Sequence, residues 1–225
     1  MSEIKNYSEI KAFIFDLDGT LFDTSVFIEA AKEALKIHGY TFTSQQIKEV
    51  FGQKVKKAIS DLIRKKEGKR KLEIEKINET FDKLCVGEYL DKVRPRPNLK
   101  RTFKKMKEMG YKLAIVTNND RIILDAILKR FGLKKYLSSS ISGDDGFEKK
   151  EDAILYLVRE LSISPKELCY IGDMPKDIKI ARKVGCKIFS IPFLIPEEKL
   201  KKERPDKIIY SIEELIKDLN YQKSQ

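Results

Sequence analysis

The chain has 225 residues, a length that allows one large domain or a core with a smaller inserted module. A hydrophobic content of 41% is enough for a buried core, while 36% of the residues are charged and the formal net charge is +11. Three widely spaced cysteines form no CxxC pair, which argues against a zinc site or a disulfide framework. No apolar stretch is long enough to span a membrane and the first ten residues are polar, so we expect a cytoplasmic protein.

The excess of basic residues has three interpretations. A basic surface can bind nucleic acid or an anionic membrane, and it can also attract small phosphate esters towards a cleft. The sequence contains no RNA-binding aromatic signature and no zinc-finger spacing. We therefore expect neither nucleic acid nor a membrane as partner, and we interpret most basic residues as a solvated surface.

The first predicted strand, at 12–15, is followed by a long stretch without a convincing strand, residues 22–94. Local sequence patterns in this stretch predict four helices, at 25–37, 44–51, 55–66 and 72–90. The stretch ends at Pro95, because proline cannot sit inside a helix. We therefore predict that 22–94 is a helical cap inserted into an α/β core formed by 1–21 and 95–225.

Beyond the insert, short apolar runs alternate with helical patterns. Strands are predicted at 113–116, 137–141, 168–171, 187–191 and 207–209. Helices are predicted at 99–109, 122–131, 152–161 and 177–184. Alternation of this kind predicts an α/β fold with a doubly wound, mainly parallel, Rossmann-like sheet.

Polar side chains follow three of the predicted strands at the point where each strand ends. They are Asp16, Asp18, Gly19 and Thr20 after the first strand, Thr117 and Asn118 after the second, and Asp173 and Asp177 after the fourth. A lysine pair, Lys149-Lys150, stands just before a predicted helix. Because ligands of a parallel sheet bind at the carboxyl ends of its strands, we expect these residues to form one site.

Carboxylates gathered at one place repel one another unless a cation compensates their charge. Oxygen ligands of this kind favour Mg²⁺, which also takes a phosphate oxygen of a substrate. With Mg²⁺ present, a carboxylate such as Asp16 can attack a phosphate. A second acid, Asp18, can protonate the leaving oxygen and then activate water, and Gly19 allows the tight bend that brings both acids to the same phosphate. Thr117 can bind phosphate oxygens, and a lysine stabilises the charge of the transition state.

The motifs Asp16-Leu17-Asp18-Gly19-Thr20, Thr117-Asn118 and Gly172-Asp173-x-x-x-Asp177 resemble those of the haloacid dehalogenase-like hydrolases. Within that superfamily the chain is most similar to the phosphoglycolate phosphatase and β-phosphoglucomutase branch. The resemblance covers nearly the whole chain, because the helical insert is similar to the cap domain of that branch.

This resemblance implies a role for each matching residue. Asp16 is implied as the nucleophile that becomes an aspartyl phosphate, and Asp18 as the general acid/base whose main-chain carbonyl also binds Mg²⁺. The other implied residues are Thr117, Asn118, Gly19 and Thr20 as phosphate-binding groups, Asp173 as a Mg²⁺ ligand, and Asp177 as a ligand or its support.

The motif lysine departs from the family pattern. The family lysine is usually followed by proline, and the local sequence from Glu148 to Asp152 contains none. We therefore assign the catalytic lysine to Lys149, with Lys150 as the alternative.

The predicted function is Mg²⁺-dependent hydrolysis of a small phosphate monoester, such as phosphoglycolate or a sugar phosphate, through an aspartyl phosphate. A phosphomutase is the alternative, since it shares this core and differs in how well the closed cap excludes water. A non-enzymatic basic binding module is a third hypothesis, but binding alone does not require Asp16 and Asp18 together. We expect a small phosphorylated metabolite as partner of a monomer or homodimer.

Overall fold

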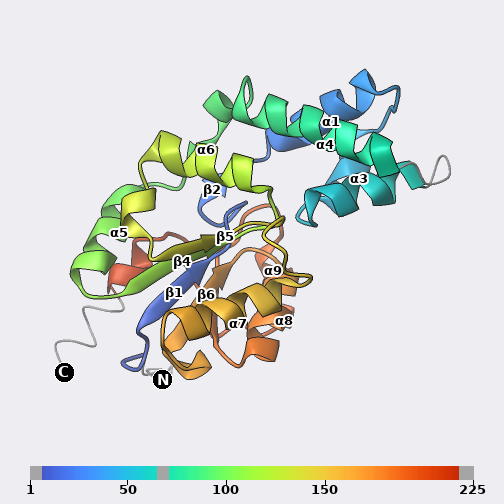
Figure 1. The fold of residues 1–225 in the computed structure, drawn as a ribbon. Helices are drawn as coiled ribbons and strands as arrows, with labels where there is room; N and C mark the ends of the chain where they lie inside the picture. Colours follow the sequence, from blue (N-terminus) through green and yellow to red (C-terminus); the bar gives the residue numbers. More distant parts are fainter. Residues whose placement is uncertain (1–6, 65–70, 218–225) are drawn as a thin grey trace.

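The computed structural model describes residues 7–64 and 71–217, and its centre is a six-stranded parallel sheet (Figure 1). The strands are β1 (Ala12–Phe15), β4 (Lys112–Val116), β5 (Ser139–Ile141), β6 (Leu168–Gly172), β7 (Lys187–Ser190) and β8 (Lys207–Ile208). They lie in the order β5-β4-β1-β6-β7-β8, and every neighbouring pair is parallel. All six coincide with predicted strands within a residue or two, which confirms the predicted α/β fold class.

Helices cover both faces of the sheet. They are α5 (Leu99–Glu108) and α6 (Arg121–Phe131) on one face, and α7 (Lys150–Glu160) and α8 (Pro175–Val184) on the other. Successive residues of a strand point to opposite faces, so Phe13 and Phe15 of β1 pack in the first layer while Ala12 and Ile14 pack in the second. The central strand is buried on both sides, as expected for a parallel sheet.

Shorter elements connect these layers. They are α9 (Glu197–Lys202) and the 3₁₀ turns at Lys134–Tyr136 and Pro165–Glu167. Helix α9 follows β7, and its Leu200 is buried in the layer that holds α7 and α8. The connections keep every strand of the sheet parallel, so all its carboxyl ends lie at one edge.

Residues 22–64 and 71–94, which we call the helical insert, lie on the side of the sheet to which the strand arrows point (Figure 1). The insert contains α1 (Phe27–Ile37), α2 (Ser44–Val50), α3 (Val55–Arg64), α4 (Lys71–Val86) and a 3₁₀ turn at Leu90–Lys92. The four predicted helices correspond to α1–α4, although residues 65 and 66 of the predicted 55–66 helix lie outside the described residues. The predicted 72–90 helix ends earlier, at Val86, where Gly87 follows.

The expectation that 22–94 contains no strand is wrong at its two ends. Strand β2 (Phe22–Asp23) pairs in antiparallel fashion with β3 (Arg94–Pro95). The chain leaves the core and returns to it side by side, so the two segments satisfy each other's main-chain groups there. The pairing is too short to produce an alternating hydrophobic pattern in the sequence.

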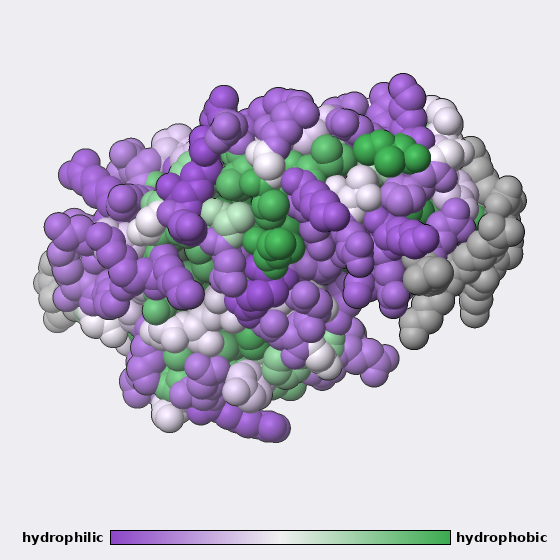
Figure 2. Space-filling view, turned by 45° about the horizontal axis from the view of Figure 1, so that its top comes forward, coloured by the Kyte–Doolittle hydropathy of each residue, from purple (hydrophilic) through white to green (hydrophobic). Residues whose placement is uncertain are grey.

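The surface matches the charged composition. Figure 2 shows hydrophilic side chains over most of the visible face, with small apolar patches between them. Within residues 7–64 and 71–217, no helix combines the length and the apolar character needed to cross a membrane.

A buried polar contact joins α4 of the helical insert to the core. Asn78 of α4 donates to Asp82 Oδ2 on its own helix at 3.0 Å and to Asp120 Oδ2, just before α6, at 2.8 Å. Burial and the negative charges of Asp120 and Asp144 raise the pKa of Asp82 to about 7, although Lys56 opposes this rise. Two carboxylates bridged by one amide are therefore held together most readily when one of them carries a proton.

This contact predicts a pH-dependent stability. The folded protein holds a proton on Asp82 more tightly than the unfolded chain does, so its stability falls as pH rises from about 4 towards 7. We expect Asp82→Asn to remove this loss. Because Asp82 is partly exposed, we expect a gain of about 1 kcal/mol, or about 2–4 °C in melting temperature, at pH 8 and almost none at pH 4. Asp152→Asn, at an exposed position, is the control, and an equal gain at both pH values contradicts the assignment.

Candidate active site

Two adjacent strands bring the main acidic residues together. Asp16 directly follows β1 and Asp173 directly follows β6, and these strands pair in register with Phe15 opposite Ile171. This is the point at which the strand order reverses, where open α/β sheets bind their ligands. Asp177, in the first turn of α8, completes a buried cluster in which each of the three acids places one oxygen within 4.8 Å of the others.

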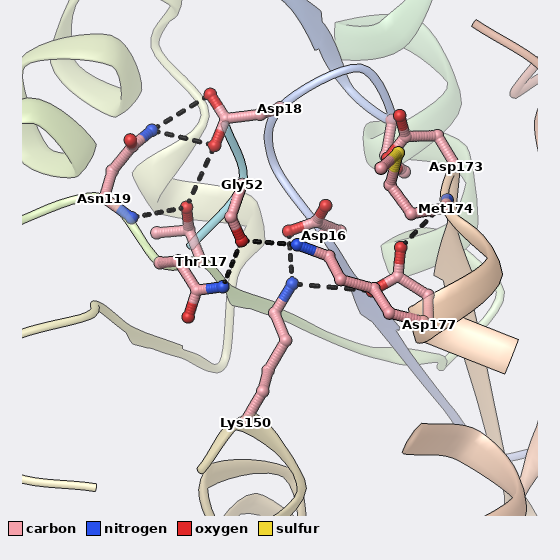
Figure 3. A network of polar contacts seen from close by, with 12 residues as sticks. Asp16, Asp18, Gly52, Thr117, Asn119, Lys150, Asp173, Met174 and Asp177 are labelled. Carbon is pink, nitrogen blue, oxygen red and sulfur yellow. Dashed lines mark hydrogen bonds and ion pairs between the residues drawn. The ribbon is translucent and has the colours of Figure 1, made fainter. Parts of the chain in front are cut away.

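Lys150 lies against this cluster (Figure 3). Its Nζ donates to Asp16 Oδ1 at 2.6 Å and lies 3.7 Å from Asp177 Oδ1. The Lys150 side chain is only 5% exposed, so its charge acts in a medium that screens poorly. One lysine thus offsets part of the charge of three carboxylates.

The assignment of the catalytic lysine to Lys149 is corrected by this geometry. Lys149 precedes α7 as an exposed N-cap residue, whereas Lys150 is the first residue of the helix. Lys150 shares the buried stripe of α7 with Ala153, Ile154 and Leu157, at the spacing of one helical face. That stripe could have identified Lys150, because only this lysine keeps the helical period of the apolar residues.

Burial and mutual repulsion set the protonation of the cluster. Burial and the charge of Asp177 raise the pKa of Asp16 to about 6, against the opposing charge of Lys150. Burial, Asp16 and Asp177 hold the pKa of Asp173 well above its usual range. Burial lowers the pKa of Lys150, but the charges of Asp16 and Asp177 outweigh it and raise the pKa overall. Lys150 therefore offsets the repulsion between these carboxylates only in part, and a hard divalent cation would offset the rest.

Neighbouring groups orient the acids. Thr20 Oγ1 donates to Asp173 Oδ1 at 3.2 Å, and Asp177 accepts from Tyr170 Oη at 3.1 Å and from the Met174 amide at 3.0 Å. The hydroxyl of Thr20, predicted to bind phosphate, is therefore directed at Asp173. Gly19 has φ +75°, and a Cβ there would lie 2.3 Å from Asp173 Oδ2, so any side chain would displace the carboxylate.

Asp18 lies apart from the three-acid cluster. Its carboxylate accepts from Thr117 Oγ1 at 3.3 Å and from Asn119 Nδ2 at 2.9 and 3.0 Å (Figure 3). It also accepts from Thr24 Oγ1 at 2.6 Å. Thr117 was predicted to be at this site. Asn119 and Thr24 were not, although Asn119 directly follows the predicted Thr117-Asn118 pair.

A cavity of about 310 Å³ lies between the cluster and the helical insert. Its lining includes Asp16, Asp18 and Lys150 from the core. Asn118, half-buried at the end of β4, donates its side-chain amide to the Gly52 carbonyl of the insert at 2.8 Å. The predicted residues that line this cavity are Asp16, Asp18, Gly19, Asn118, Asp173 and the alternative lysine, Lys150. Thr20, Thr117 and Asp177 do not line it but lie next to these acids. Lys149 does not line the cavity.

We predict that Lys150 and Lys149 differ in their effect on stability. Lys150→Met, studied by urea unfolding at pH 8 with a chelator present, leaves buried carboxylates without their partner and should cost about 3 kcal/mol. Lys149→Met, the matched control, should change stability by less than about 0.5 kcal/mol. The Lys150→Met cost should shrink as pH falls, because the carboxylates then take up protons. Equal effects of the two substitutions contradict the placement.

Known proteins provide an independent comparison. The sequence pattern of the haloacid dehalogenase-like hydrolases matches residues 13–191. The chain is 27% identical over 217 residues to the phosphoglycolate phosphatase of Vibrio parahaemolyticus, covering 92% of this chain and 95% of that protein. It is 29% identical over 223 residues to a protein of Caldanaerobacter subterraneus provisionally named pyrophosphatase PpaX, covering 93% of this chain and 94% of that protein.

Solved structures show the same fold. CbbY from Rhodobacter sphaeroides, in complex with phosphate, superposes with a TM-score of 0.78 at 22% identity and covers 92% of this chain and 96% of its own. The haloacid dehalogenase-like protein SP0104 from Streptococcus pneumoniae superposes with a TM-score of 0.76 at 19% identity and covers 94% and 99%. These matches confirm the predicted resemblance, and the chain belongs to the haloacid dehalogenase-like hydrolase family.

Proposed function

We propose that the protein hydrolyses small phosphate monoesters with Asp16 as nucleophile and Mg²⁺ as cofactor. The observation that carries this proposal is the placement of Asp16 at the cavity, paired with Lys150 and adjoining two more buried carboxylates. An Asp16 oxygen would form a bond to phosphorus while the bond from phosphorus to the leaving oxygen breaks. Water would then attack the phosphorus, release inorganic phosphate and restore the carboxylate.

The donor set fits Mg²⁺. Asp16, Asp173 and Asp177 offer closely spaced carboxylate oxygens, and Lys150 offsets only part of their charge. Hard oxygen ligands with excess negative charge favour a small divalent cation. When bound, Mg²⁺ would offset the repulsion between these carboxylates and the substrate phosphate. The main-chain carbonyl of Asp18 would be a further ligand of Mg²⁺.

The remaining residues would bind the phosphoryl group or transfer protons. Lys150, in place of Lys149, would stabilise the negative charge of the transferring phosphoryl group, with Thr117 and Asn118 binding its oxygens. Asp18 would donate a proton to the leaving oxygen and later take one from the attacking water. Its contacts with Thr24 and Asn119 hold the carboxylate at the cavity wall, where it can be positioned for this transfer.

The helical insert would act as the cap of this site. It supplies Gln45, Lys48 and Gly52 to the lining of the same cavity, so it faces the substrate side of Asp16. A cap in this position limits the access of water and selects the leaving group. The names of the relatives, phosphoglycolate phosphatase and pyrophosphatase, support a small phosphorylated metabolite as substrate.

We predict Mg²⁺-dependent hydrolysis of para-nitrophenyl phosphate that depends on Asp16. Turnover should be lost when EDTA replaces Mg²⁺, because the carboxylates then repel the substrate. Asp16→Asn should lower kcat by about 10³-fold or more, since the amide is a poor nucleophile.

The control is Asp152→Asn, which changes the same functional group at an exposed position of α7. This variant should keep the activity of the parent protein. Turnover that survives Asp16→Asn, in protein shown to be folded by circular dichroism, contradicts the assigned nucleophile. Turnover that is insensitive to EDTA contradicts the assigned cofactor.

A further inference from the structure

Two core side chains converge on one carbonyl of the helical insert. Asn118 Nδ2 donates to the Gly52 carbonyl at 2.8 Å, and Lys176 Nζ donates to the same oxygen. Gly52 lies in the loop between α2 and α3 with φ +81°, and a Cβ there would lie 2.7 Å from Lys176 Nζ. The main chain of this loop therefore lies close to Lys176, and one carbonyl oxygen accepts hydrogen bonds from both Asn118 and Lys176.

Lys176 is placed to act on a ligand in the cavity. It stands in the first turn of α8, is half-buried and lines the cavity together with Asp16, Lys150 and Asp173. Lys150 is paired with Asp16, whereas no carboxylate of residues 7–64 and 71–217 forms an ion pair with Lys176. Its charge also lowers the pKa of Asp16, but its hydrogen bond goes to a neutral carbonyl, a weaker partner than an anionic oxygen.

The direction of the reaction places Lys176 on the side of the leaving group. In phosphoryl transfer the attacking and leaving oxygens lie roughly in line on opposite sides of the phosphorus. Asp16 attacks from the edge of the sheet, so the leaving group points towards the helical insert. The contact between Lys176 and Gly52 lies where the core meets that insert.

We propose that Lys176 binds a second anionic group carried by the leaving group of the substrate. The oxygen of that group would replace the Gly52 carbonyl as the partner of Lys176 Nζ. The inference rests on the proposed function and narrows its substrate class to phosphate esters or anhydrides whose leaving group bears a carboxylate or a phosphate. A sugar phosphate with a neutral sugar offers Lys176 no such charge.

Binding is measured by calorimetry with Mg²⁺ in the Asp16→Asn background, so that no ligand is consumed. The ligands are phosphoglycolate, which carries a second anionic group, and ethyl phosphate, which does not. Adding Lys176→Gln should raise the dissociation constant for phosphoglycolate by about tenfold or more, the effect of a lost charge-assisted hydrogen bond. The increase for ethyl phosphate should be clearly smaller.

Lys179→Gln is the matched control. It removes the same charge from the same helix, but Lys179 points to solvent and pairs with Glu203 at 3.1 Å. This variant should leave both dissociation constants unchanged. An unchanged affinity of the Lys176→Gln protein for phosphoglycolate, or an equal loss of affinity for both ligands, overturns the proposal.

Steady-state kinetics in the otherwise unaltered protein separate this inference from the proposed function. Lys176→Gln should lower the ratio of kcat/KM for phosphoglycolate to kcat/KM for ethyl phosphate by about tenfold or more. A parent protein without phosphatase activity contradicts the proposed function, and the binding comparison then still decides the role of Lys176. An active parent whose ratio is unchanged by Lys176→Gln overturns the inference alone.

Discussion

The ion pair between Lys150 and Asp16 is the interaction on which the site depends. Parallel strands β1 and β6 end side by side, which forces Asp16 and Asp173 together, and α8 adds Asp177. Three buried carboxylates are stable in one place only if positive charge reaches them. Lys150 supplies part of that charge. The carboxylate charge that it does not offset makes the cluster suitable for a divalent cation, which could then bind a substrate phosphate.

The carboxyl edge of the sheet also holds the helical insert. The core segments that follow β1, β4, β5 and β6 carry the catalytic candidates, and those after β4, β5 and β6 also bind the insert. Asn118 and Lys176 bind the Gly52 carbonyl, while Lys54 of the insert donates to the carbonyl of Phe147. Movement of the insert would therefore change the partners of side chains that line the cavity. If the insert acts as the proposed cap, the same few hydrogen bonds would link substrate selection to closure.

Particular residues show which features of the site can be predicted from the sequence alone. The apolar runs at 12–15 and 168–171 predict buried strands, so the positions of Asp16 and Asp173 at one edge follow from topology. The choice between Lys149 and Lys150 depends on the residue at which α7 begins, and no proline marks that start. The contact of Lys176 with Gly52 joins residues 124 positions apart. No hydrophobic periodicity in the sequence predicts such a contact, because the contact arises from the packing of the insert on the core.

The central claim is that Asp16 carries the phosphoryl group during turnover. The most direct test mixes the protein with para-nitrophenyl phosphate and Mg²⁺, quenches the reaction with acid within one turnover, and locates the phosphoryl group by peptide fragmentation in a mass spectrometer. The account predicts the added mass of one phosphoryl group on Asp16, and none on Asp18 two residues later. A phosphoryl group on another residue, or product formation during which no residue is ever phosphorylated, would contradict it.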